Sequence, residues 1–485
     1  MVSSSAQSIE ISDRRPAAGD GGPALNPALS DWLAELVRKS DDWFAGHGVR
    51  ELLVQEIARA NPQSWFWVDV YPRWRDAPES DPEQMLRDWR AGEYNRIEFL
   101  YLHLPFCAQR CHFCYYFIST DFTHSQDYLE MLRREVRTFL TTLPAAASAG
   151  ALFIGGGTPS MMPVDDLQRL YDEVYEHLDR DRIGMVTLEL HPRTMRRGLH
   201  RLAATGHIRR VSMGVQTFSR PVLEANGRIW VEPERIRKIA TEFREAGVEH
   251  IGLDFMVGLH TETVADVLAD LGHIAMLARE GLIDSVSVYP RSFTEIWGPF
   301  AGEVVDDQTL TEKFRSHLLY RTFFEDLGWT EGPMYLFTSP TFKAAVPSAL
   351  VNGPRTAQSL AFGNSARSTF ADTNYLNNRS PDTYREIMGS HSGATSAHQP
   401  FTRAEINRRH LHFGVKRGSF DVGQLPVSPS APEATQLDAV TDDLVRRELV
   451  RRNGSLVELT DVGKLLVELV HHEYEQTFPE PEHQP

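Results

Sequence analysis

The sequence predicts an α/β fold: a partial (β/α)6 TIM-like barrel with an N-terminal extension and a small, mostly helical C-terminal domain. Six short apolar, β-branched runs alternate with helix-like patterns between about Ile97 and Tyr289, and the composition changes on both sides of that region. Alternation of strands and helices at this spacing predicts parallel strands joined by right-handed crossovers. The chain has 485 residues, enough for about three domains of roughly 150 residues each.

The predicted strands and helices of the barrel follow from these patterns. The expected strands cover Ile97–Leu104, Ala151–Ile154, Val186–Leu190, Arg210–Met213, His250–Met256 and Ser285–Tyr289. The main expected helices cover Gln126–Leu140, Val164–Leu178, Glu232–Ala246 and Thr263–Arg279. Six such strands fit a partial barrel or a doubly wound sheet, and in both folds functional residues collect at the carboxyl ends of the strands.

The remaining sequence divides into regions of different composition. We expect a disordered leader over 1–25, a helical and aromatic extension over 26–95, the core barrel over 96–300, a barrel extension and connecting region over 301–389, a linker over 390–400 and the C-terminal domain over 401–485. The leader is rich in Ser, Ala, Gly and Pro and lacks the apolar segment of a secretory signal. The composition of 390–400 is typical of a linker.

Charge and composition restrict the expected partners. The chain carries 50 Lys and Arg against 66 Asp and Glu, a formal net charge of −16. We expect no nucleic-acid or anionic-membrane partner, because an acidic chain has little overall capacity to release phosphate counterions. No apolar run reaches about 18 residues, so no membrane span is expected. Three cysteines are too few for a disulfide framework, and we expect a cytoplasmic protein with reduced thiols.

All three cysteines lie within eight residues, directly after the first predicted strand. Cys107, Cys111 and Cys114 have the spacing Cys-x3-Cys-x2-Cys. Soft thiolates suit zinc or iron–sulfur clusters. A structural zinc ion needs a fourth ligand, for which His103 and His112 are nearby. A 4Fe–4S cluster held by three thiolates instead leaves one iron open to a substrate atom.

Other candidate residues stand at the ends of the following strands. Glycines after the second strand let the backbone approach a ligand, although a tight turn needs the same residues. Glu189 ends the third strand, where a carboxylate can pair with a cationic group or simply face solvent. Gln216 ends the fourth strand and Arg228 follows twelve residues later. Asp254 interrupts an apolar strand, so its carboxylate needs a partner.

The segment from Tyr101 to Cys114, Tyr-Leu-His-Leu-Pro-Phe-Cys-Ala-Gln-Arg-Cys-His-Phe-Cys, resembles the cluster loop of radical S-adenosylmethionine (SAM) enzymes. It is most similar to the HemN-like family of oxygen-independent coproporphyrinogen III oxidases, and the resemblance covers about Asp69–Tyr289 motif by motif. It implies a 4Fe–4S cluster on the three cysteines and one or two bound SAM molecules. The resemblance implies cofactor contacts from Tyr101, Phe113, Gly156, Gly157, Thr158, Glu189, Gln216, Arg228 and Asp254.

The resemblance also implies the reaction. A cluster reduced by a low-potential donor such as flavodoxin or ferredoxin cleaves SAM to a 5′-deoxyadenosyl radical, which abstracts hydrogen from a small-molecule substrate. The sequence departs from the family pattern in several places. Tyr116 replaces a further cysteine of the porphyrinogen oxidases, and Tyr71-Pro72-Arg73-Trp74 only loosely resembles their Tyr-Pro segment. His260 replaces a proline common in the family, and the sixth strand ends Val286-Ser-Val-Tyr-Pro-Arg291, unlike the heme-chaperone branch.

These departures lie in parts of the family that contact substrate. We therefore expect a HemN-like methylase or related tailoring enzyme that transfers a methyl or methylene group to a small aromatic or conjugated metabolite. The alternatives are coproporphyrinogen III dehydrogenase, a heme chaperone that binds without cleaving SAM, and a zinc-stabilised binding module. The residue that relays or quenches the substrate radical is not assigned.

Overall fold

The computed structural model describes residues 27–59, 79–114, 116–291, 307–332, 335–342, 358–425 and 432–478. The predicted leader over 1–25 lies outside the described residues. No helix within the described ranges combines the length and the apolar character needed to cross a membrane.

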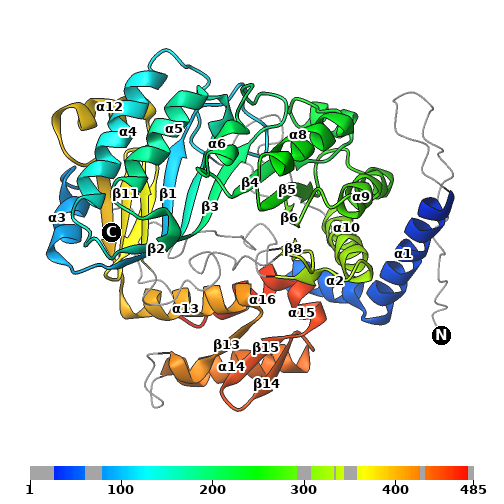
Figure 1. The fold of residues 1–485 in the computed structure, drawn as a ribbon. Coiled ribbons are helices and arrows are strands. Elements are labelled where there is room, and N and C mark those ends of the chain that lie inside the picture. The colour runs from blue at the N-terminus through cyan, green and yellow to red at the C-terminus, as the bar shows by residue number, and fades with distance from the viewer. Residues whose placement is uncertain are drawn as a thin grey trace, which may run out of the picture.

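Six parallel strands form the centre of the molecule (Figure 1). They are β1 (Arg96–Leu104), β2 (Ser148–Gly156), β3 (Ile183–Leu190), β4 (Arg210–Gln216), β5 (His250–Val257) and β6 (Ser285–Pro290). They pair in parallel and in chain order. This order is that of a barrel, because a doubly wound sheet reverses its strand order at a switch point. The sheet is open in the part of the chain that the structure describes, and the predicted partial barrel is confirmed.

Helices follow the strands and cover the outer face of the sheet. They are α4 (Ser125–Leu140), α5 (Val164–Tyr175), α6 (Arg201–Ala204), α7 (Arg220–Ala225), α8 (Pro233–Glu245) and α9 (Val264–Arg279), with short 3-10 turns η2 (Pro159–Met161) and η3 (Arg180–Arg182). In α4, Leu129, Leu132 and Val136 recur at helical spacing and are buried against the sheet. In α9, Thr263 and Asp266 form a reciprocal capping box.

Further strands extend the sheet at both edges. Beside β1, the strand β9 (Ser359–Phe362) is parallel, and β10 (Arg367–Phe370), β11 (Thr373–Asn377) and β12 (Thr395–Pro400) continue in antiparallel pairs. Beyond β6 follow β8 (Leu336–Thr338) and β7 (Thr330–Glu331), also antiparallel. The region 301–389 therefore contributes strands to the central sheet, together with α12 (Pro381–Ser390).

The prediction of a linker at 390–400 is wrong. Residues Thr395–Pro400 form the edge strand β12, which pairs with β11. The Ser396 hydroxyl donates to the Leu376 carbonyl at 3.0 Å, and the Thr395 amide donates to the Pro82 carbonyl at 3.0 Å. These long-range hydrogen bonds order a segment whose own composition has little strand propensity.

The N-terminal helices are α1 (Pro27–Gly46), α2 (Val49–Arg59) and α3 (Gln84–Ala91). Helix α1 packs along α10 (Asp307–Asp326), as Figure 1 shows. The C-terminal domain contains α13 (Arg403–Arg417), β13 (Ser419–Asp421), η4 (Val422–Gln424), α14 (Pro432–Arg446), β14 (Val450–Asn453), β15 (Leu456–Leu459), α15 (Asp461–Leu465) and α16 (Val467–Glu475). It is mostly helical, as predicted, around a small three-stranded antiparallel sheet.

The C-terminal domain shares its hydrophobic core with α2 and α10. Leu310 and Phe314 of α10 are buried in the same cluster as Leu469 of α16. Within this interface Lys313 and Glu468 form a buried ion pair at 3.4 Å. Because Lys313 also lies against Gly258 at the end of β5, this interface holds the C-terminal domain next to the carboxyl edge of the barrel.

Candidate functional site

The cysteine loop is closed at its base directly after β1. The Cys107 amide donates to the Ser119 carbonyl at 2.9 Å, and the Ser119 amide donates to the Pro105 carbonyl at 2.8 Å. These two hydrogen bonds join the beginning and the end of the segment 105–119. The three cysteines therefore lie on one short loop at the carboxyl edge of the barrel. Cys111 is buried, and Cys107 and Cys114 are half-buried.

The three thiols influence one another and are not in disulfides. Burial raises the pKa of Cys114 to about 11, and the neighbouring Cys111 and Cys107 act in the same direction. Burial also raises the pKa of Cys107, opposed by a hydrogen bond between its sulfur and the Thr158 hydroxyl at 3.1 Å. Thiolates in this loop therefore need a cationic partner, which a metal centre provides.

The spread of the three sulfurs favours a polynuclear centre over a single zinc ion. Among the described residues, the one group of three ligand side chains whose atoms all lie within 4.8 Å is Glu173, Glu176 and His177, on the outer helix α5. At least one pair of the three cysteine sulfurs therefore lies farther apart than 4.8 Å. Tetrahedral zinc with Zn–S bonds of about 2.3 Å requires sulfurs only about 3.8 Å apart. A three-cysteine 4Fe–4S centre fits this donor set.

The glycine turn after β2 is packed too tightly for any side chain. A Cβ on Gly156, whose φ is +113°, would lie 2.6 Å from the His103 ring. A Cβ on Gly157 would lie 2.6 Å from the Pro105 backbone at the start of the cysteine loop. These glycines therefore allow the turn to lie directly against the loop.

The amides of this turn are already used inside the protein. Gly156 donates to the Glu189 carboxylate at 3.1 Å, Gly157 donates to the Leu104 carbonyl at 2.7 Å, and Thr158 donates to the Phe106 carbonyl at 2.8 Å. Gly156, Gly157 and Thr158, which the resemblance implies as cofactor contacts, all lie in this turn. Its backbone carbonyls are hydrogen-bond acceptors, for which an ammonium group of a ligand is a suitable donor.

Two carboxylates lie on the inner face of the barrel. Leu188 and Leu253 pack outward under the helices, so Glu189 and Asp254, one residue later on each strand, point inward. Burial raises the pKa of Glu189 to about 8, and the negative charge of Asp254 adds to this effect.

Burial also raises the pKa of Asp254, whose carboxylate accepts from the Ser212 hydroxyl at 2.9 Å. Two acids that oppose each other's ionisation are stabilised when a cation enters between the strands that carry them. The predicted pairing of Glu189 with a cationic group of the ligand is compatible with these surroundings, and the contact predicted for Asp254 is with hydroxyls of the SAM ribose.

Gln216 and Arg228 meet at the end of β4. Gln216 has a φ of +71°, and the pairing of β4 with β5 shifts register between Gly214 and Gln216. A left-handed conformation is uncommon at a residue other than glycine, and here it accompanies the irregularity in the pairing of β4 with β5. Arg228 donates to the Gly214 carbonyl at 2.6 Å and to the Cys111 sulfur at 3.5 Å. Its guanidinium therefore links this strand end to the cysteine loop.

The two predicted aromatic contacts have different surroundings. Tyr101 is on the inner face of β1, where its hydroxyl lies 3.1 Å from His103 Nδ1 and its ring lies against Phe153. His103 Nε2 donates to the Phe117 carbonyl at 3.3 Å, and burial lowers its pKa to about 4, so it is neutral and supports the loop. Phe113 packs on the apolar cluster formed by Val222, Met256 and Leu259.

Two residues that position the site were not predicted from the sequence. Asn226 accepts from the His112 amide through its carbonyl at 3.1 Å, and Asp270 of α9 accepts from the Phe218 amide at 2.6 Å, two residues after Gln216. Both side chains are fully buried. A polar side chain within an apolar helical pattern was the available signal for Asp270, the same signal that identified Asp254.

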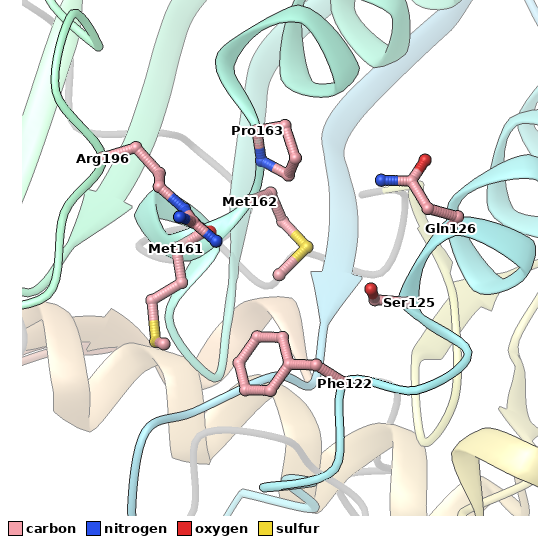
Figure 2. A pocket seen from close by; sticks show the side chains of 7 residues that line it. All are labelled: Phe122, Ser125, Gln126, Met161, Met162, Pro163 and Arg196. Atoms are coloured by element: carbon pink, nitrogen blue, oxygen red, sulfur yellow. The ribbon is translucent and has the colours of Figure 1, made fainter.

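A cavity of about 360 Å³ lies outside the barrel, beside this site. Figure 2 shows Met161, Met162 and Pro163 facing Ser125 and Gln126 across it, with Phe122 at its lower end. None of the predicted cofactor residues lines this cavity, and Gln126 is occupied by a hydrogen bond to Asp166 at 2.5 Å. This cavity is therefore separate from the residues that are predicted to contact the cofactor.

Comparisons with known proteins show which families the chain resembles. The sequence pattern of the radical SAM superfamily matches residues 101–274. The heme chaperone HemW of Buchnera aphidicola subsp. Schizaphis graminum is 28% identical over 174 residues, which are 36% of this chain and 46% of the chaperone. The chain thus aligns with less than half of that relative. Anaerobilin synthase of Escherichia coli O157:H7 is 24% identical over 401 residues, 79% of this chain and 85% of that protein.

The solved structure of the radical SAM enzyme coproporphyrinogen III oxidase (HemN) from Escherichia coli has the same fold. Its TM-score is 0.71 at 22% identity, and the match covers 84% of this chain and 97% of that one. The matched pattern spans the cysteine loop, the glycine turn and the strand-end residues described above. Residues 101–274 therefore match the radical SAM superfamily, and the chain is similar to the HemN/HemW-like proteins within it.

Proposed function

We propose that the protein is a radical SAM enzyme that modifies a small aromatic or conjugated metabolite, most closely as a HemN-like methylase or tailoring enzyme. The supporting observation is the convergence of a three-cysteine loop, a ligand-accepting glycine turn and two buried acids at one end of the barrel. A 4Fe–4S centre with SAM bound at its open iron supplies a 5′-deoxyadenosyl radical.

The residues of the chain bind and orient SAM in this proposal. Cys107, Cys111 and Cys114 hold the centre. The carbonyls of the glycine turn accept from the SAM ammonium group. Glu189 and Asp254 offset the positive charge of SAM or bind its ribose hydroxyls, each at a carboxylate whose pKa burial has raised.

The rim of the barrel is where the chain departs from the porphyrinogen oxidases, and this supports a different substrate. Arg291, directly after β6, donates to His260 Nε2 at 2.8 Å, so two of the departures form one pair. Tyr116 and Phe117 expose 51% and 40% of their surface beside the cysteine loop. Exposed aromatic rings are suited to stacking on a conjugated substrate.

The test is anaerobic reconstitution with iron and sulfide, followed by dithionite, SAM and a panel of small aromatic and conjugated compounds that can accept the methyl carbon. Methyl or methylene transfer requires both 5′-deoxyadenosine and S-adenosylhomocysteine among the products, and 5′-deoxyadenosine alone would contradict it. The Cys111→Ala variant is the control for reagent-driven cleavage.

Tetrapyrrole chemistry is the second candidate, because the alignment with anaerobilin synthase covers 79% of this chain. Parallel reactions with coproporphyrinogen III and with heme distinguish it: consumption of either one, with SAM cleavage, would replace the methylase proposal. Stoichiometric heme retention without SAM cleavage would instead favour a chaperone. A low-potential donor such as flavodoxin or ferredoxin is the proposed physiological reductant.

A further inference from the structure

The turn that follows α7 forms a platform for the cysteine loop. Three consecutive residues each contact that loop. Asn226 accepts from the His112 amide at 3.1 Å, the Gly227 carbonyl accepts from the Gln109 side chain at 2.6 Å, and Arg228 donates to the Cys111 sulfur at 3.5 Å. The platform therefore holds the loop from two residues before Cys111 to one residue after it.

The close approach of the platform depends on Gly227. Its φ is +63°, and a Cβ there would lie 2.7 Å from His112 Nε2. The platform itself is fixed from behind, because Asn226 Nδ2 donates to the His260 carbonyl at 3.0 Å and the Arg228 amide donates to the Leu223 carbonyl at 2.9 Å. The contact with Cys111 is thus part of a rigid arrangement.

The Arg228 guanidinium lies between two fixed acceptors. One amino group points to the Cys111 sulfur, and the other donates to the Gly214 carbonyl at 2.6 Å.

We infer that Arg228 is a positioning residue of the iron–sulfur centre, which holds the Cys111 sulfur and makes the centre easier to reduce before SAM binds. The inference rests on the proposed function. Hydrogen bonds to ligand sulfur and positive charge near a cluster stabilise its reduced, more negative state. An arginine whose one task is to bind the SAM carboxylate would leave the reduction potential of the SAM-free centre unchanged.

The experiment measures that potential directly. Wild type, Arg228→Gln and Arg228→Lys are reconstituted with iron and sulfide, kept free of SAM, and titrated with a reductant under potentiometric control while EPR follows the reduced centre. The matched control is Arg220→Gln in the preceding helix α7, since Arg220 pairs with Glu224 at 2.7 Å on the exposed side.

We expect R228Q to be harder to reduce by at least tenfold in the reduction equilibrium, which is about 59 mV for one electron. R228K keeps the charge but loses the planar fork, so its shift should be smaller. R220Q should match the wild type. R228Q could fold but fail to assemble the iron–sulfur centre, while R220Q assembles it. That result would support the positioning of Cys111 by Arg228, and the reduction potential would then be compared between R228K and the wild type.

Equal SAM-free potentials in wild type, R228Q and R228K would overturn the inference and leave the proposed function intact. The failure of the wild type itself to assemble an iron–sulfur centre would overturn the proposed function. The two failures are therefore distinguishable in the same set of samples.

Discussion

Gly156 provides the sharpest test of the packing at the glycine turn. In Gly156→Ala the new Cβ would meet the His103 ring at 2.6 Å, and the residue would have to keep a φ of +113°. Left-handed backbone costs about 1–2 kcal/mol for a residue with a Cβ. Forcing an extra methyl group into a packed site costs about 1–3 kcal/mol more. We expect a total loss of about 2–5 kcal/mol in the free energy of unfolding.

Gly247→Ala is the matched control, because Gly247 has a φ of +91° and its Cβ would meet nothing within 4 Å. It should show only the backbone cost. Urea unfolding followed by tryptophan fluorescence measures both variants, and SAM binding by calorimetry should be weakened in Gly156→Ala alone. His103→Ala makes room for the methyl group, so the double variant should lose less than the sum of the single losses. Equal destabilisation at positions 156 and 247, with an additive double variant, would refute this reasoning.

Three other predictions concern buried polar groups. Because burial raises the pKa of Glu189 from 4.5 to about 8, the folded chain keeps a proton that the unfolded chain has released, and the free energy of unfolding falls as the pH rises through this range. In Glu189→Gln the free energy of unfolding, measured with urea, should therefore depend less on pH between pH 5 and 8. The same pH dependence in the variant and the wild type would contradict this. Asp270→Ala should lower the free energy of unfolding by about 1–3 kcal/mol and weaken SAM binding, because it leaves the buried Phe218 amide without its acceptor. Asp270→Asn should retain most of the stability and most of the SAM affinity. Equal effects of the two variants would contradict this. Lys313→Met should lower the free energy of unfolding by about 3–5 kcal/mol, measured by heat or urea, because it leaves the buried Glu468 carboxylate without its cationic partner. The double variant Lys313→Met with Glu468→Leu should recover most of that loss. A double variant as unstable as the single one would argue against the ion pair.

The sequence was most informative where one physical signal dominates. The predicted strand Ile97–Leu104 differs from β1 by one residue, and the predicted helix Thr263–Arg279 differs from α9 by one residue. Both elements bury a continuous apolar pattern in the core of the barrel. Local periodicity is a reliable guide in such cases because the pattern and the burial have the same cause.

The edge of the sheet could not be predicted in this way. The strands β9 and β10 have four residues each, too few to establish a period. The strand β12 contains Thr, Ser, Ala, His, Gln and Pro, and its order comes from pairing with β11 and from contacts with residues near Pro82. These partners are distant in sequence, so composition alone indicated a linker.

In the candidate site, too, some features could be predicted from the local sequence and others depend on tertiary packing. The spacing of Cys107, Cys111 and Cys114 was visible in the sequence, and the inward direction of Glu189 and Asp254 follows from strand alternation. The contact of Arg228 with the Cys111 sulfur depends on how α7 packs under the loop, which a single sequence does not contain.

The most direct test of the central claim is the iron stoichiometry and EPR spectrum of anaerobically reconstituted protein, before and after addition of SAM. We predict four irons and four sulfides per chain, an S = 1/2 signal on reduction, and a change of that signal when SAM binds to the open iron. A zinc-containing, colourless protein, or a signal that SAM leaves unaltered, would contradict the account.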